Sequence, residues 1–91
     1  MEEDRLSRAI VEHYGLYWTD EAHDAILAEV GPDGLREIEK IISEAGSEEI
    51  WLYADMAVAY SETQNLLRSK YPFLSDAAVM RVANSAAYGW K

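Results

Sequence analysis

The sequence contains no cysteine, which excludes disulfides and thiolate metal sites. Basic residues are also scarce, with 8 Lys and Arg against 17 Asp and Glu and a net charge of −9. Proteins that bind phosphate backbones concentrate Lys and Arg on one face. We therefore expect no direct nucleic-acid binding.

Long hydrophobic runs are missing too. The most apolar stretch, residues 50–60, contains one charged residue, Asp55, and is shorter than the roughly 20 residues of a membrane-spanning helix. The first four residues include three acids, and no apolar segment of a signal peptide follows them. The expectation is a cytoplasmic protein that does not contact a membrane.

Most of the remaining sequence has helical spacing. A chain of 91 residues that is 49% hydrophobic is long enough for one domain. Apolar residues recur three and four positions apart, and glycine and proline fall between these segments. The pattern predicts an all-α, single-domain bundle of about five helices, over residues 3–14, 20–30, 33–45, 47–71 and 75–90, with a long central fourth helix.

The predicted fourth helix sets the expected core. Met56 and Tyr60 lie on its most apolar stripe, so we expect both to be buried. Asp55 falls on another side of that helix together with Glu62. We expect it to be solvated or paired with Arg81, since the carboxylate spacing of a magnesium site is missing.

His13 and His23 are the only histidines. With Asp20 or Asp24 they could form a metal or acid–base site between the first two helices. Asp20 and His23 have the i, i+3 spacing of helical di-metal proteins, but those proteins use the motif twice and add two further carboxylates. We therefore expect two histidines at the edge of the core, without metal or cofactor.

Motifs of the common catalytic classes are lacking. The sequence contains no glycine-rich phosphate loop, no Gly-x-Ser-x-Gly turn and no His-Glu-x-x-His pair. The prediction is a binding protein without enzymatic activity.

The acidic residues are unevenly distributed. Residues 1–50 contain 14 acids and 4 basic residues, whereas residues 51–91 contain 3 and 4. An aromatic connector, Tyr17-Trp18, adjoins the acidic first half, and exposed Tyr and Trp commonly anchor interfaces. These features predict a partner-binding surface of seven residues: Tyr17, Trp18, Asp20, Glu21, Asp24, Glu37 and Glu44.

Such a surface favours a small acidic inhibitor that covers a basic, nucleic-acid-binding surface of another protein. Immunity proteins, antitoxins and phage anti-defence proteins, including anti-CRISPRs, have a similar size and charge, which is an analogy and not a sequence resemblance. Two alternatives remain open. One is a helical assembly module that forms a homodimer or larger homo-oligomer, and the other is a small metal-dependent hydrolase that uses His13, His23 and acidic neighbours.

Overall fold

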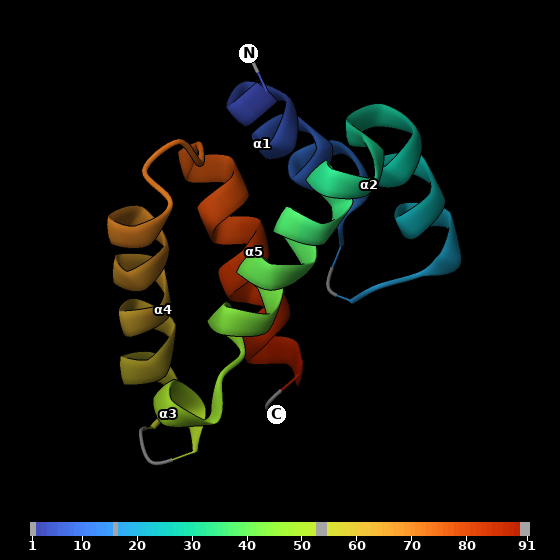
Figure 1. Ribbon diagram of the computed structural model, residues 1–91. Helices are drawn as coiled ribbons and strands as arrows, with labels where there is room; N and C mark the ends of the chain where they lie inside the picture. Colours follow the sequence, from blue (N-terminus) through green and yellow to red (C-terminus); the bar gives the residue numbers. More distant parts are fainter. Residues whose placement is uncertain (1, 16, 53–54, 90–91) are drawn as a thin grey trace.

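The computed structural model describes residues 2–15, 17–52 and 55–89. It contains α1 (Glu2–His13), α2 (Asp20–Ala45), α3 (Glu48–Trp51), α4 (Met56–Lys70) and α5 (Asp76–Gly89) (Figure 1). Helices account for 83% of the described residues, and these residues include no strand. The predicted all-α class is confirmed.

The second and third predicted helices form the two halves of α2. Thr19 caps its start, since the Thr19 hydroxyl accepts a hydrogen bond from the Ala22 amide at 3.0 Å. Gly31 lies inside α2 with φ 80° and ψ 175°, and Pro32 follows it. The two halves therefore run in different directions (Figure 1), and the kink lies at the predicted helix boundary.

The prediction of one long central helix over residues 47–71 is wrong. The segment is divided into α3 and α4, and residues 53–54 between them lie outside the described residues. The Asp55 carboxylate caps α4 and accepts hydrogen bonds from the amides of Ala57 and Val58 at 3.2 and 3.4 Å. An aspartate that bonds to nearby backbone amides starts a new helix in preference to continuing an old one. Asp55 is exposed to solvent, as expected, but it lies at the start of α4 and not on a helix face, and the ion pairs of the described residues do not include Asp55 with Arg81.

The expected burial of Met56 is wrong for the same reason, whereas that of Tyr60 is met in part, because Tyr60 packs against the core. Met56 is the first residue of α4 and is 42% exposed, because no further turn of this helix precedes it. Tyr60, one turn later, is half-buried. The buried residues of α4 are Ala59, Thr63 and Leu67.

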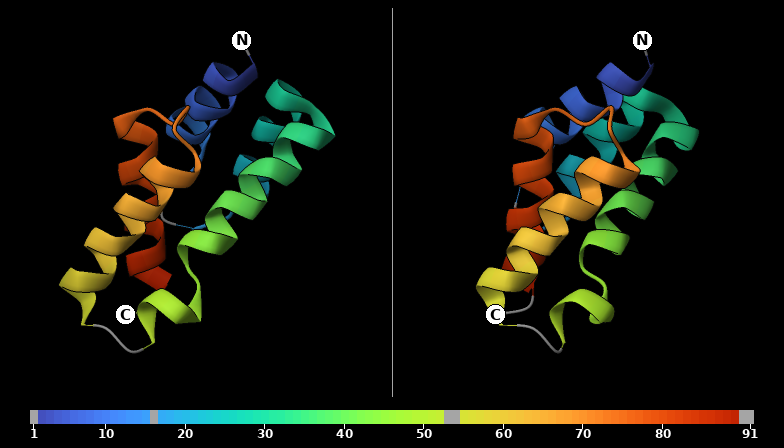
Figure 2. Two further views of the ribbon diagram at one scale, coloured as in Figure 1. Left: turned by 60° about the vertical axis from the view of Figure 1, so that its left-hand side comes forward. Right: turned by 90° about the vertical axis from the view of Figure 1, so that its left-hand side faces the viewer.

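The core instead surrounds α5, which packs against α1, α2 and α4 (Figure 2). Its inward face is built of small side chains, which allows the neighbouring helices to approach closely. The fully buried large side chains of the core come from all four of these helices and from the residue that follows α1: Ile10, Tyr14, Ile26, Ile38, Ile41, Leu67, Val79 and Val82.

Polar contacts tie α5 to the residues around α1. The hydroxyls of Tyr14 and Ser85 form a buried hydrogen bond. The Arg81 guanidinium donates to the Tyr14 carbonyl at 2.8 Å. The Ser75 amide, just before α5, donates to the Ser7 hydroxyl at 2.8 Å. No helix in the described part of the chain is long and apolar enough to cross a membrane.

Candidate partner-binding surface

Three of the predicted acidic residues lie together at the start of α2. Asp20, Glu21 and Asp24 are all exposed. Asp20 and Glu21 lie in the first turn, where carboxylates are stabilised by the positive end of the helix dipole. The Thr19 cap fixes where this turn begins, and so where the carboxylates emerge from the helix.

The connector before α2 presents one of its two predicted aromatic residues to solvent. Tyr17 is 58% exposed, and its ring stacks on that of Tyr88 at the end of α5, with centroids 5.9 Å apart. Trp18 is half-buried, with its ring 5.0 Å from that of Tyr14 and 6.3 Å from that of His23. Tyr17 is therefore available to a partner, whereas Trp18 mainly covers the core.

Glu44 lies in the second half of α2 and is engaged inside the molecule. Its carboxylate accepts hydrogen bonds from the Tyr71 hydroxyl at 2.6 Å and from the Lys70 ammonium at 3.0 Å. The bond from Tyr71 is the main reason why the pKa of Glu44 is lowered. Burial, and then the Glu44 carboxylate, raise the pKa of Tyr71. Glu44 joins the end of α2 to the end of α4 and is not grouped with the acids at the start of α2.

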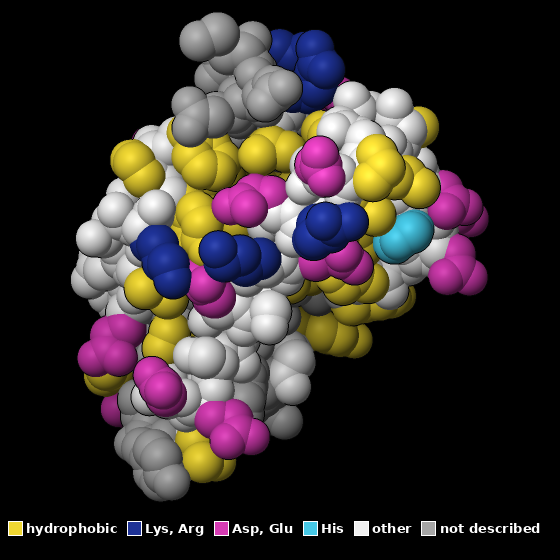
Figure 3. All heavy atoms as spheres, in the orientation of Figure 1, with side chains coloured by type: hydrophobic (Ala, Val, Ile, Leu, Met, Phe, Trp, Pro, Cys, Tyr) yellow, Lys and Arg dark blue, Asp and Glu magenta, His cyan; other side chains and the backbone are white. Residues whose placement is uncertain are grey.

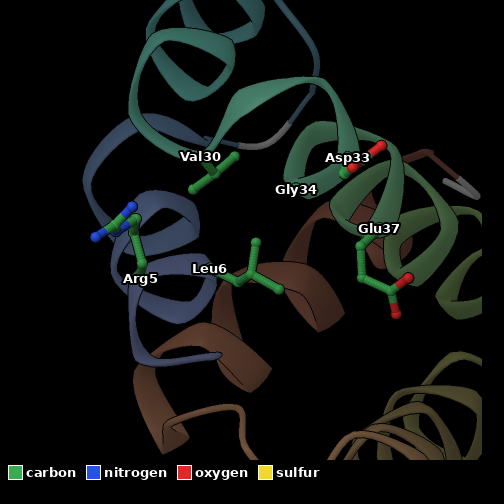
Figure 4. A pocket seen from close by; sticks show the side chains of 6 residues that line it. All are labelled: Arg5, Leu6, Val30, Asp33, Gly34 and Glu37. Carbon is green, nitrogen blue, oxygen red and sulfur yellow. The ribbon is translucent and has the colours of Figure 1, made fainter. Parts of the chain in front are cut away.

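Glu37, also in the second half of α2, is half-buried and lines a cavity of about 270 Å³. The other lining residues are Arg5, Leu6, Val30, Asp33 and Gly34 (Figure 4). Gly34 permits the close packing here, because a Cβ atom at this position would lie 2.6 Å from the Val30 Cβ. The lining is mixed, since Leu6 and Val30 are apolar and Arg5, Asp33 and Glu37 are charged, and the cavity lies between α1 and the kink of α2.

The two histidines have different surroundings. His13 Nε2 lies 2.8 Å from a Glu29 carboxylate oxygen and 3.9 Å from one of Glu12, and these three ligand atoms lie within 4.8 Å of one another. His23 is outside this group and lies 3.4 Å from Asp24 through Nδ1. The described residues thus do not bring His13 and His23 into one ligand group, as the alternative of a site between the first two helices required. Glu29 meets His13 because α2 packs against α1, and the positions of the two histidines in the sequence give no sign of this contact.

The side chains of Glu12, His13 and Glu29 are of the types that bind divalent metals, but their closeness also has a simpler explanation. His13 and Glu29 satisfy each other through a hydrogen bond, and the Glu12 side chain is 51% exposed. Structural zinc sites use four protein ligands and catalytic ones three with a bound water, so the three ligands of this group match only the catalytic kind. The expectation that the protein works without metal therefore remains a prediction.

Charge pairing differs between the two halves of α2. The ion pairs with Lys or Arg in the described residues are Arg36–Asp33, Arg68–Asp76 and Lys70–Glu44. On the face shown in Figure 3, basic and acidic side chains alternate in a band, whereas acids gather beside a histidine at the right-hand edge, over the first half of α2. In the part of the chain that the structure describes, Asp20, Glu21 and Asp24 have no Lys or Arg partner.

Comparison with protein-family models, with curated proteins and with solved structures found no match.

Proposed function

We propose that the protein is a non-enzymatic binding protein that uses the start of α2 to cover a basic surface of a partner protein. The surface consists of Tyr17, Asp20, Glu21 and Asp24 and is called the α2 entry surface below. The observation that carries the proposal is the position of three unpaired charges beside an exposed aromatic residue. Asp20, Glu21 and Asp24 are exposed and lack a Lys or Arg partner in the described residues, whereas Asp33, Glu44 and Asp76 are in ion pairs. Unlike other unpaired acids such as Glu48 and Glu49, they closely follow the exposed Tyr17 in the chain.

Unpaired surface carboxylates attract a basic protein before contact. Complementary fields raise the association rate by orders of magnitude at low salt, and the effect falls as the Debye length shortens. A net charge of −9 supplies such a field. On contact, the carboxylates can accept paired hydrogen bonds from arginine side chains.

Tyr17 supplies the apolar part of the surface. Its ring is held against Tyr88, so binding orders few additional side-chain torsions. Tyrosine contributes large contact area at low entropic cost, which is why it recurs at the centres of interfaces. We therefore assign the acids mainly to the association rate and Tyr17 mainly to the dissociation rate.

The finer form of the proposal is an inhibitor of a nucleic-acid-binding protein. Basic surfaces on proteins most often serve to bind phosphates, and a protein that covers such a surface with carboxylates competes with nucleic acid. By analogy of size and charge, the proposed function is of the type of immunity proteins, antitoxins and phage anti-defence proteins.

The test uses two matched pairs of substitutions. Asp20→Asn with Glu21→Gln neutralises the first turn of α2, and Glu48→Gln with Glu49→Gln neutralises the first turn of α3 as the control. Partners are captured from a lysate of the host on the immobilised protein, and their binding kinetics are measured between about 50 and 300 mM salt, a range over which electrostatic steering weakens strongly.

We expect a basic partner whose association rate falls with salt and falls about tenfold in the α2 pair at low salt, with little change in the α3 pair. Tyr17→Ala should raise the dissociation rate. An association rate that is independent of salt, or an equal effect of both pairs, contradicts the proposal.

A further inference from the structure

The cavity between α1 and the kink of α2, called the kink cavity below, combines an apolar wall with charges of both signs. Leu6, Val30 and Gly34 form the wall. A Cβ atom on Gly34 would lie 2.6 Å from the Val30 Cβ and 3.2 Å from the Leu6 Cδ2, so these residues pack against one another. The side chains of Leu6 and Val30 are only half-buried, and each of them is therefore partly open to a ligand.

Two charged residues lie on opposite sides of this wall (Figure 4). Arg5 belongs to α1, and Glu37 belongs to the second half of α2. Among the side chains that the structure describes, those of residues 5–15, 17–52 and 55–89, neither Arg5 nor Glu37 has a partner in an ion pair. Asp33, the third charged lining residue, is paired with Arg36 at 3.8 Å. Arg5 and Glu37 are therefore the charges that a ligand can engage.

The arrangement of these charges selects the kind of ligand. A simple anion is attracted by Arg5 but repelled by Glu37, and the reverse holds for a simple cation. A zwitterion satisfies both residues at once, because its carboxylate can accept hydrogen bonds from the guanidinium and its ammonium group can donate to the carboxylate of Glu37. The apolar wall between the two charges favours an aliphatic chain between the two ends of the ligand.

The size of the kink cavity limits the ligand to a small molecule. Its volume is about 270 Å³, just below the roughly 300–1,000 Å³ of sites for drug-sized ligands. We propose that this cavity binds a small ω-amino acid, an aliphatic chain with a carboxylate at one end and an ammonium group at the other. The carboxylate binds Arg5, the ammonium group binds Glu37, and the chain packs on Leu6 and Val30.

The test is a titration of the full chain with ω-amino acids of increasing length, followed by NMR. The probes are γ-aminobutyrate, δ-aminovalerate and ε-aminocaproate, and the methyl signals of Leu6 and Val30 report binding. For the best of the three probes we expect a dissociation constant on the order of 1 mM, because a ligand of so few atoms gains only modest affinity. If neither residue's methyl signals shift with any probe up to about 50 mM, the proposal is overturned.

Three related compounds test the parts of the ligand. The carboxylic acid and the amine of the same chain length each lack one charge, and leucine carries both charges on one carbon atom. We expect each compound to bind at least about fivefold more weakly than the best ω-amino acid, since each loses a charge-assisted hydrogen bond or the spacing between the two. An amine that binds equally well would reveal a simple cation site, and leucine that binds better would contradict the separated charges. Either result overturns the proposal.

Two substitutions locate the site on the protein. Arg5→Gln and Glu37→Gln each remove one of the charges that hold the ligand. Arg8→Gln and Glu39→Gln are the matched controls, because they remove exposed charges from the same helices outside the cavity. We expect the dissociation constant of the best ω-amino acid to rise about fivefold in each of the first two variants and to change little in the controls. Equal binding by all four variants refutes the assigned site.

The two variants should also affect different compounds. Arg5→Gln should weaken the remaining binding of the carboxylic acid but not that of the amine, and Glu37→Gln should weaken the amine but not the acid. The opposite pattern would contradict the proposed orientation of the ligand. No lining residue of the kink cavity belongs to the α2 entry surface, so these results are independent of the proposed partner binding.

Discussion

Replacing Gly31 by alanine tests the kink that organises α2. The φ of 80° and ψ of 175° at Gly31 lie in a region that only glycine occupies readily. A Cβ atom at this position meets no heavy atom within 4 Å, so the substitution changes the backbone preference and creates no clash. Any loss of stability then measures the conformation and not the packing.

The expected size follows from two opposing terms. A non-glycine residue in this region costs on the order of 1–3 kcal/mol in the folded state. Replacing glycine by alanine also restricts the unfolded chain, which offsets about 0.4–1 kcal/mol of this cost. The net loss is therefore about 1–2 kcal/mol, a large fraction of the stability of a domain of this size.

Urea denaturation followed by circular dichroism measures the effect. With a slope of about 1 kcal/mol per M, the midpoint of Gly31→Ala should fall by about 1–2 M. Gly15→Ala is the matched control. Gly15 also has open space around its Cβ position, but its φ is not positive, so the variant should be as stable as the wild type or slightly more stable. Equal midpoints for the two variants would refute the assigned backbone conformation.

Four further variants or treatments test the structure away from the kink. Met56→Ala should cost well under the 2–5 kcal/mol of a fully buried methionine, measured by urea midpoint, because Met56 is 42% exposed. Asp55→Ala should lose about 1 kcal/mol with its cap, and Asp55→Asn should retain most of it. Because the pKa of Glu44 is lowered in the folded state, its contribution to stability is present at neutral pH and is lost as pH falls below 4.5. Glu44→Gln should therefore lower the free energy of unfolding at pH 7 and change it little at pH 3. Tyr71→Phe should have the same pH dependence, because the Tyr71 hydrogen bond is the main cause of the lowered Glu44 pKa. Excess EDTA or added Zn²⁺ should leave the melting temperature unchanged. A melting temperature that changes with metal in the wild type but not in His13→Gln would contradict the prediction that the protein binds no metal.

The helix class and most boundaries could be predicted because their signals are local. Thr19 before Asp20 is a cap that needs no tertiary contact, and Gly31-Pro32 interrupts a helix wherever it occurs. The break at Asp55 was missed because the surrounding residues are apolar and the pattern continues through it. An aspartate in such a run favours a helix start as much as a helix interior, and periodicity does not distinguish the two.

The candidate surface could be predicted only where its members are neighbours in sequence. Tyr17, Asp20 and Asp24 lie together because the connector and the first turns of α2 hold them together. Glu44 satisfies the same outward spacing, but its carboxylate is bound by Lys70 and Tyr71, which are distant in sequence. Long-range pairing of this kind depends on the path of the whole chain and leaves no mark in local periodicity.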